Sequence, residues 1–202
     1  MIIHNCEQGS EEWFAVKCGK ISASHFSEVL SKKPGRVTYM RKVAAERQYG
    51  ISHESYSNKA MKSGIEGEPK ARAYYDGLFG PVEQVGFVEL NDYVGCSPDG
   101  LVGDYGLVEI KCPHPSTHVK YVAGKKMPSD YVAQVQGQLW VTGRKWCDFV
   151  SFLPHAKKGN PFWHIKVERD EKYINVLSIA VETFIQEMEK LESKIKNNSI
   201  SF

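Results

Sequence analysis

Three charged residues in the middle of the chain have the types and spacing that hydrolysis of a phosphodiester bond requires. Asp99 precedes a glycine, and after nine intervening residues come Glu109 and Lys111, with Ile110 between them. On a strand, alternate side chains share one face, so we expect Glu109 and Lys111 to project together while Ile110 points into the core. Two antiparallel strands joined through residues 103–106 would then bring Asp99 next to Glu109.

The chemistry of such a group follows from its charges. Two carboxylates at close range repel each other unless a proton or a cation neutralises them. Oxygen-only ligation suits a hard ion such as Mg²⁺, which water and phosphate oxygens usually complete. Lys111 would orient the attacking water or assist its deprotonation, and would stabilise charge that develops on phosphorus. From the residues alone, a surface hairpin carrying unrelated charges stays open beside this interpretation.

The elements that must position these side chains are predicted from periodicity and turn residues. We expect helices over 22–30, 37–49, 58–78 (with a break near 64–69), 129–141 and 171–196, and strands over 82–90, 93–96, 107–111, 145–153 and 161–167. This order predicts an α/β fold, a single domain whose central mixed β-sheet is flanked by helices. Its expected parts are a helical N-terminal part over about 1–80, a sheet core over about 81–168 and a C-terminal helix over about 170–196.

Composition excludes several other classes of protein. At 202 residues, with 42% hydrophobic and 25% charged residues, the chain has the size and composition of one soluble domain. It lacks an apolar run long enough to span a membrane and a secretory signal, so we expect a protein of the reducing cytoplasm without membrane contact. The net charge of +2 gives no bulk affinity for nucleic acid, so a DNA-binding surface would need local segregation of charge.

Six short segments occur in an order that resembles the phage lambda exonuclease family of viral recombination nucleases. These YqaJ-like proteins belong to the PD-(D/E)XK nuclease superfamily, and the matching segments are 21–24, 64–68, 96–101, 109–113, 133–142 and 168–173. The resemblance implies a restriction-endonuclease-like core and a Mg²⁺-dependent exonuclease, with Mn²⁺ as a substitute ion. It implies processive 5′-to-3′ digestion of one strand of linear double-stranded DNA, which leaves 3′ single-stranded DNA for recombination.

The resemblance also implies a third acidic metal ligand, taken from a helix four residues after a glycine. That position is Glu68, which would complete a cluster with Asp99, Glu109 and the carbonyl oxygen of Ile110. Glu66 lies off the matching register, so we expect it to be a solvated helix charge.

A pocket for the terminal 5′-phosphate is implied in the same way, and its lining by register is Lys17, Ser24, Ser97 and Gln134. A dianionic phosphate requires one cation and several neutral donors. The family pattern has arginine where this chain has Lys17, and lysine keeps the charge but loses the two-pronged geometry. For Ser24, a helix-capping role is the alternative.

Contacts with DNA outside the site are expected from a basic turn and from one apolar residue. Lys32, Lys33 and Arg36 would touch phosphates or a groove, although a solvated turn is the alternative. Met61 aligns with an apolar wedge that splits the duplex end in family members, although methionine is more often core filler. The resemblance further implies a ring-shaped homotrimer around DNA and a single-strand annealing protein as partner.

Three alternatives of other kinds stay open at this point. The same core serves restriction-like endonucleases, and a non-catalytic DNA-end-binding protein could share the fold. A zinc protein using Cys112, His114 and His118 is the third, although Pro113 and Pro115 predict a rigid loop there.

Overall fold

The computed structural model of the chain describes the backbone of residues 1–52 and 59–199 and the side chains of residues 1–52 and 67–197. Its helices are α1 (Glu11–Lys17), η1 (Ala23–His25), α2 (Phe26–Leu30), α3 (Pro34–Tyr49), α4 (Lys59–Phe79), α5 (Pro115–Gly124), η2 (Ser129–Tyr131), α6 (Val132–Thr142) and α7 (Glu171–Ser199). Its strands are β1 (Ile2–His4), β2 (Ile21–Ser22), β3 (Val82–Glu83), β4 (Phe87–Asn91), β5 (Val94–Cys96), β6 (Gly100–Val102), β7 (Gly106–Lys111), β8 (Trp146–Phe152) and β9 (Phe162–Glu168). The predicted single α/β domain is confirmed.

The strands form two mixed sheets where the sequence suggested one. The first has the order β1-β4-β5-β2, and the second has the order β3-β6-β7-β8-β9. The predicted strand over 82–90 is divided between them, because the chain passes from β3 to β4 through Gly86. A side chain at Gly86 would meet the carbonyl oxygen of Cys6 at 2.3 Å, so the close approach of these two segments requires glycine.

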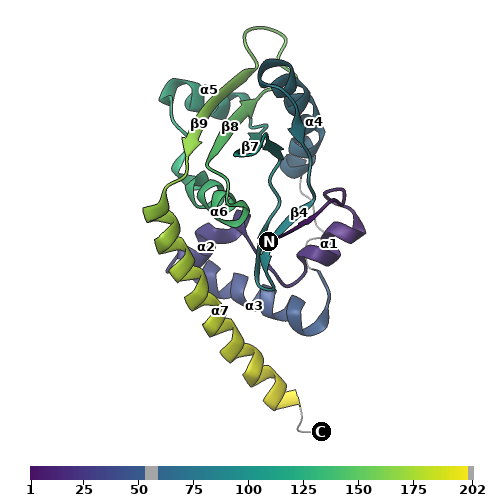
Figure 1. Cartoon of the computed structure of the whole chain (residues 1–202), viewed down its shortest axis with the longest axis vertical. Coiled ribbons are helices and arrows are strands. Elements are labelled where there is room, and N and C mark those ends of the chain that lie inside the picture. The colour runs from purple at the N-terminus through teal and green to yellow at the C-terminus, as the bar shows by residue number, and fades with distance from the viewer. Residues whose placement is uncertain (53–58, 200–202) are drawn as a thin grey trace.

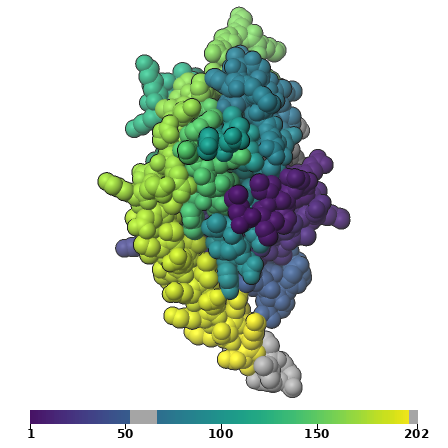
Figure 2. Space-filling model, in the orientation of Figure 1, coloured from purple at the N-terminus to yellow at the C-terminus, as the bar shows by residue number. Residues whose placement is uncertain are grey.

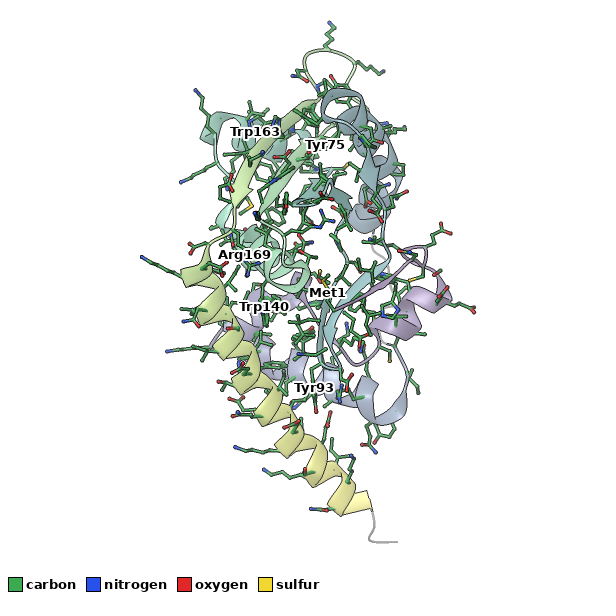
Figure 3. The ribbon with its side chains drawn as sticks, in the orientation of Figure 1. Met1, Tyr75, Tyr93, Trp140, Trp163 and Arg169 are labelled. Atoms are coloured by element: carbon green, nitrogen blue, oxygen red, sulfur yellow. The ribbon has the colours of Figure 1, made fainter. Side chains whose placement is uncertain are left out.

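The five-stranded sheet is covered by α4 on one face and by α6 on the other (Figure 1). Successive residues of β7 point to opposite faces. Val108 and Ile110 pack with Tyr75 of α4 in one apolar cluster, while Leu107 packs with Leu139 of α6 in the main core. Figure 3 labels Tyr75 on α4 and Trp140 on α6.

The C-terminal helix α7 is attached to the domain through one apolar stripe. The stripe has the three-and-four spacing of a half-buried helix, and its buried residues are Ile174, Leu177, Val181, Phe184 and Met188. Ile179 is off the stripe and 55% exposed. Figure 2 shows α7 along one edge of the molecule, with the N-terminal segment on the other side. None of the helices in the described part is long and apolar enough to cross a membrane.

Two predictions about proline were wrong. The break expected near 64–69 is absent, since α4 continues through Pro69, and its buried residues Ala71 and Tyr75 are held by the sheet. The rigid loop expected over Pro113 and Pro115 covers only residues 112–114, since α5 begins at Pro115 with His114 as its N-cap. Proline is favourable in the first turn of a helix because its missing N–H has no partner to lose there.

Candidate active site

The hairpin of β6 and β7 places Asp99 beside the next strand. Gly100 pairs with Val108 in an antiparallel register, so the residue before Gly100 lies opposite the one after Val108. The Asp99 carboxylate accepts a hydrogen bond from the backbone N–H of Ile110, with Oδ2 and N 2.6 Å apart. The predicted proximity of Asp99 and Glu109 through this hairpin is therefore what the structure has.

Glu109 is the most fully paired carboxylate of the site and is only 1% exposed. Its Oε1 accepts hydrogen bonds from the Lys111 ammonium and from Gln134 Nε2, the latter at 2.6 Å. Its Oε2 accepts from Gln138 Nε2 at 2.7 Å. A buried carboxylate requires this many donors because each oxygen has lost its water. Strand β7 and helix α6 therefore contact each other here through polar groups, although apolar residues surround this point.

Lys111 remains a cation in this environment. Burial by itself lowers the pKa of Lys111, but the charges of Glu109 and Asp99 outweigh burial and leave the pKa above its usual value. The ring of Tyr131 lies 5.1 Å from the ammonium and adds a cation–π contact. The side chain therefore stands as a positive charge between carboxylates and an aromatic ring.

Two carboxyl groups of the site have a raised pKa. Burial, followed by the charges of Glu109 and Glu68, raises the pKa of Asp99 well above its usual value. Burial also raises the pKa of Glu68, with Glu109 adding to the effect and Arg72 opposing it. Part of each shift is repulsion from a neighbouring carboxylate, and a cation bound beside these groups would relieve that repulsion.

In this structure, however, side chains of the site are bonded to basic groups of the protein. Arg72 donates to Glu68 through Nη2 and to the Asp99 carbonyl oxygen through Nε, the latter at 3.2 Å. Among the described side chains, no three His, Cys, Asp or Glu groups stand close enough to hold one metal ion. The oxygen donors have the chemistry that a hard divalent cation prefers. In this arrangement the Arg72 guanidinium binds the Glu68 carboxylate, and the Lys111 ammonium binds the Glu109 carboxylate.

Comparison with known proteins identifies the family to which the chain belongs. The YqaJ-like viral recombinase domain matches residues 12–145, about two thirds of the chain. The chain belongs to the YqaJ-like viral recombinase family. The structure of an alkaline exonuclease from Laribacter hongkongensis is similar with a TM-score of 0.88 and 37% identity, covering 94% of this chain and 98% of that one. The same Laribacter protein has also been solved with dAMP, and that structure matches with a TM-score of 0.87 and 37% identity over the same shares.

Two further relatives are more distant or shorter. A phage-related exonuclease from Haemophilus somnus 129PT shares the fold with a TM-score of 0.69 at 17% identity, covering 87% of this chain and 96% of that one. The Escherichia coli (strain K12) protein ExoD is 33% identical over 67 residues, which is 33% of this chain and 76% of ExoD.

Of the four residues expected to line a phosphate pocket in this YqaJ-like protein, two are connected through a shared neighbour, and the other two have separate partners. The Lys17 ammonium lies 4.3 Å from the ring of Trp13, and the indole N–H of Trp13 donates to Ser97 Oγ at 2.9 Å. Ser24 Oγ donates to a neighbouring serine, Ser22. Gln134 is turned to Glu109 instead. Trp13 therefore joins two of the four.

The residues expected to contact DNA differ from one another in their exposure and in their contacts. Lys32 and Lys33 are exposed where α3 begins. Arg36 lies inside α3 and not in a turn, and its guanidinium donates to Glu187 Oε2 on α7 at 2.5 Å. The helical position of Arg36 corrects the prediction that the basic turn extends to this residue. Met61 and Glu66 lie outside the part whose side chains the structure describes.

The three residues of the zinc alternative have separate partners. His114 accepts from the N–H of Ser116 as a helix cap, and buried His118 shares a 2.8 Å hydrogen bond with Ser151 Oγ. Cys112 lies against α4, where a side chain at Gly67 would meet its sulfur at 2.8 Å.

Two residues that bind the carboxylates of the site were not foreseen from the sequence. Arg72 holds Glu68 one helical turn away, and Gln138 holds Glu109 one turn after Gln134. For Gln138 a signal existed, because residues four apart on a helix share a face. For Arg72 the same spacing from Glu68 is typical of an ordinary surface ion pair.

Proposed function

We propose that this YqaJ-like protein is a Mg²⁺-dependent exonuclease that digests one strand of linear double-stranded DNA processively from its 5′ end. The 3′-ended strand would remain for recombination by single-strand annealing. The observation that carries the proposal is the Lys111 ammonium bonded to the buried Glu109 carboxylate beside Asp99. The 37% identity with the Laribacter alkaline exonuclease, over nearly the whole of both chains, supports the same conclusion.

Glu68, Asp99, Glu109 and the Ile110 carbonyl oxygen would hold the metal ion. Bound there, Mg²⁺, or Mn²⁺ as a substitute, would polarise the scissile phosphate and acidify a water molecule. Glu68 would have to leave Arg72 to join this set, and the released guanidinium would then be available to a phosphate. Lys111, held at Glu109 and under the Tyr131 ring, would orient the attacking water and stabilise charge at phosphorus.

The 5′-terminal phosphate would be recognised by Lys17, Ser24, Ser97 and Gln134. One cation with hydroxyl and amide donors matches a dianionic phosphate. The link from Lys17 through Trp13 to Ser97 supports this assignment for two of the four. Since lysine presents a single ammonium, recognition would depend on charge more than on two-pronged geometry.

A homotrimeric ring and a single-strand annealing partner complete the proposal. Closure around DNA would explain processive digestion at a net charge of +2. The residues proposed to contact the duplex are Lys32, Lys33, Arg36 and Met61, and Arg36 would have to leave Glu187 to do so. Light scattering on the purified chain tests the ring, since a monomeric mass in the presence of DNA would exclude it.

A time course of four reactions on three DNA substrates tests the activity. Linear duplexes with 5′-phosphate or 5′-hydroxyl ends and covalently closed circles are incubated with Mg²⁺, and a linear sample is incubated with EDTA. We expect fast loss of one strand from the 5′-phosphate duplex, slower loss from the 5′-hydroxyl duplex, and no loss from circles or in EDTA. Rapid cutting of circles would identify a restriction-like endonuclease instead. Tight binding of ends without any degradation would identify a non-catalytic end-binding protein.

A further inference from the structure

We infer that Gln138 is a positioning residue that holds Glu109 in the orientation required for metal binding; this rests on the proposed function. Gln138 is 1% exposed, and its Nε2 donates to Glu109 Oε2 at 2.7 Å. The contact joins the middle of α6 to the middle of β7, two elements whose backbones the core already fixes. The amide therefore reaches the carboxylate from a rigid support.

The other end of the Gln138 amide shows what decides its orientation. Within the described part of the chain, Gln138 Oε1 is buried and has no hydrogen-bond partner. Leaving a buried acceptor unpaired costs about 1–3 kcal/mol. The reverse orientation would bring this oxygen against the Glu109 carboxylate, where like partial charges repel. The fold thus keeps an unpaired acceptor so that the N–H group meets Glu109.

The two carboxylate oxygens of Glu109 therefore have different partners. Gln138 holds Oε2, and Oε1 faces Lys111 and Gln134. A carboxylate held at one oxygen cannot rotate freely, so the other oxygen is presented in a constant direction. Ligand carboxylates in metal sites are oriented by such outer partners, and loss of one typically weakens metal affinity or activity about 10–100-fold.

A second glutamine on the same helix has a different role and provides a matched control. Gln136 is 4% exposed, and both ends of its amide are paired. Its Nε2 donates to the Glu168 carbonyl oxygen at 2.9 Å, and its Oε1 accepts from the Asp170 N–H at 2.9 Å. These bonds join α6 to the chain that enters α7. Gln136 therefore supports the fold without touching the site.

The test compares leucine substitutions at the two positions. The affinity for Ca²⁺ and Mg²⁺ alone is measured by titration calorimetry, and kcat, KM and Tm are measured on the same preparations. For Gln138→Leu we expect a metal Kd about 10–100-fold higher, kcat lowered over the same range, and KM for DNA unchanged. For Gln136→Leu we expect a lower Tm, with metal Kd and kcat within about twofold of the parent. Gln138→Met keeps the side-chain length and replaces Gln138→Leu if that variant does not fold.

The outcomes separate the inference from the function on which it rests. If either Gln138 variant binds metal and cleaves DNA like the parent, or loses only Tm as Gln136→Leu does, Gln138 is merely structural and the inference is wrong. If the parent protein itself neither binds the metals nor degrades DNA, the proposed function fails, and the inference fails with it.

Discussion

Each face of the five-stranded sheet buries one carboxylate, and the two carboxylates differ in the number of hydrogen bonds that they accept. On the α6 face, Glu109 accepts hydrogen bonds from an ammonium and two amides. On the α4 face, Asp148 is 4% exposed, yet it accepts only the Tyr75 hydroxyl at 2.6 Å. The second oxygen of Asp148 has no partner among the described residues. Burial of an acid does not by itself identify a site, because a site also needs donors that define a direction.

The Tyr75–Asp148 pair has the character of a structural contact. Burial, followed by the hydrogen bond to Asp148, raises the pKa of Tyr75 far above its usual value, so the phenol keeps its proton and remains a donor. Apolar residues surround the pair, including Val108 and Val150. Changes on this face should therefore alter stability, and changes on the α6 face should alter hydrolysis.

The largest expected effect is on the α6 face. Lys111→Ala should lower kcat about 10²–10⁴-fold, because the ammonium that orients water and stabilises charge is lost. Duplex-end binding and circular dichroism should stay close to the parent, since Glu109 keeps both amide donors. Cleavage by this variant at the parental rate would exclude the role proposed for Lys111.

On the α4 face, Tyr75→Phe should change stability alone. The variant leaves the buried Asp148 without a donor and should lower the free energy of unfolding by roughly 1–3 kcal/mol in urea titrations. Hydrolysis per folded molecule should be unchanged. Adding Asp148→Asn should restore part of the loss, and a fall in kcat would contradict the separation of the two faces.

Asp99→Asn should have opposite effects on activity and stability. The amide removes a buried charge that Glu109 and Glu68 oppose, so in EDTA the free energy of unfolding should rise by roughly 1 kcal/mol, or about 2–4 °C in Tm. Hydrolysis should be lost, and Mg²⁺ should raise the Tm of the parent but not of the variant. A parental response of the variant to Mg²⁺ would remove Asp99 from the proposed ligand set.

The smallest expected effect concerns pH. Burial lowers the pKa of His118, so the folded protein keeps this imidazole neutral while the unfolded chain takes up a proton. The contribution of His118 to the free energy of unfolding is fully present above about pH 6.5 and is lost as the pH falls from there towards the pKa of His118 in the folded protein. The free energy of unfolding changes by at most about 1.4 kcal/mol per pH unit in this window. His118→Gln should flatten the urea midpoint between about pH 7.5 and pH 5. An unchanged pH profile would show that other groups govern acid sensitivity.

Much of the local structure could be predicted from the sequence alone. The hairpin that brings Asp99 to Glu109 follows from its glycines and from the period-two pattern of 107–111, and the stripe of α7 follows from spacing. These features depend on neighbours within a few residues, where backbone geometry limits the possibilities. The assignment of Asp99, Glu109 and Lys111 to one site follows from the same short range.

Only the tertiary structure decided the partners of those charges. It divided the predicted strand at 82–90 between two sheets, bound Arg36 to Glu187 across 151 positions, and turned Gln138 rather than Gln136 to Glu109. The partner of a long side chain depends on which distant element packs beside it, and one sequence carries no direct record of that contact. Periodicity defines a face, whereas the packed chain defines what the face meets.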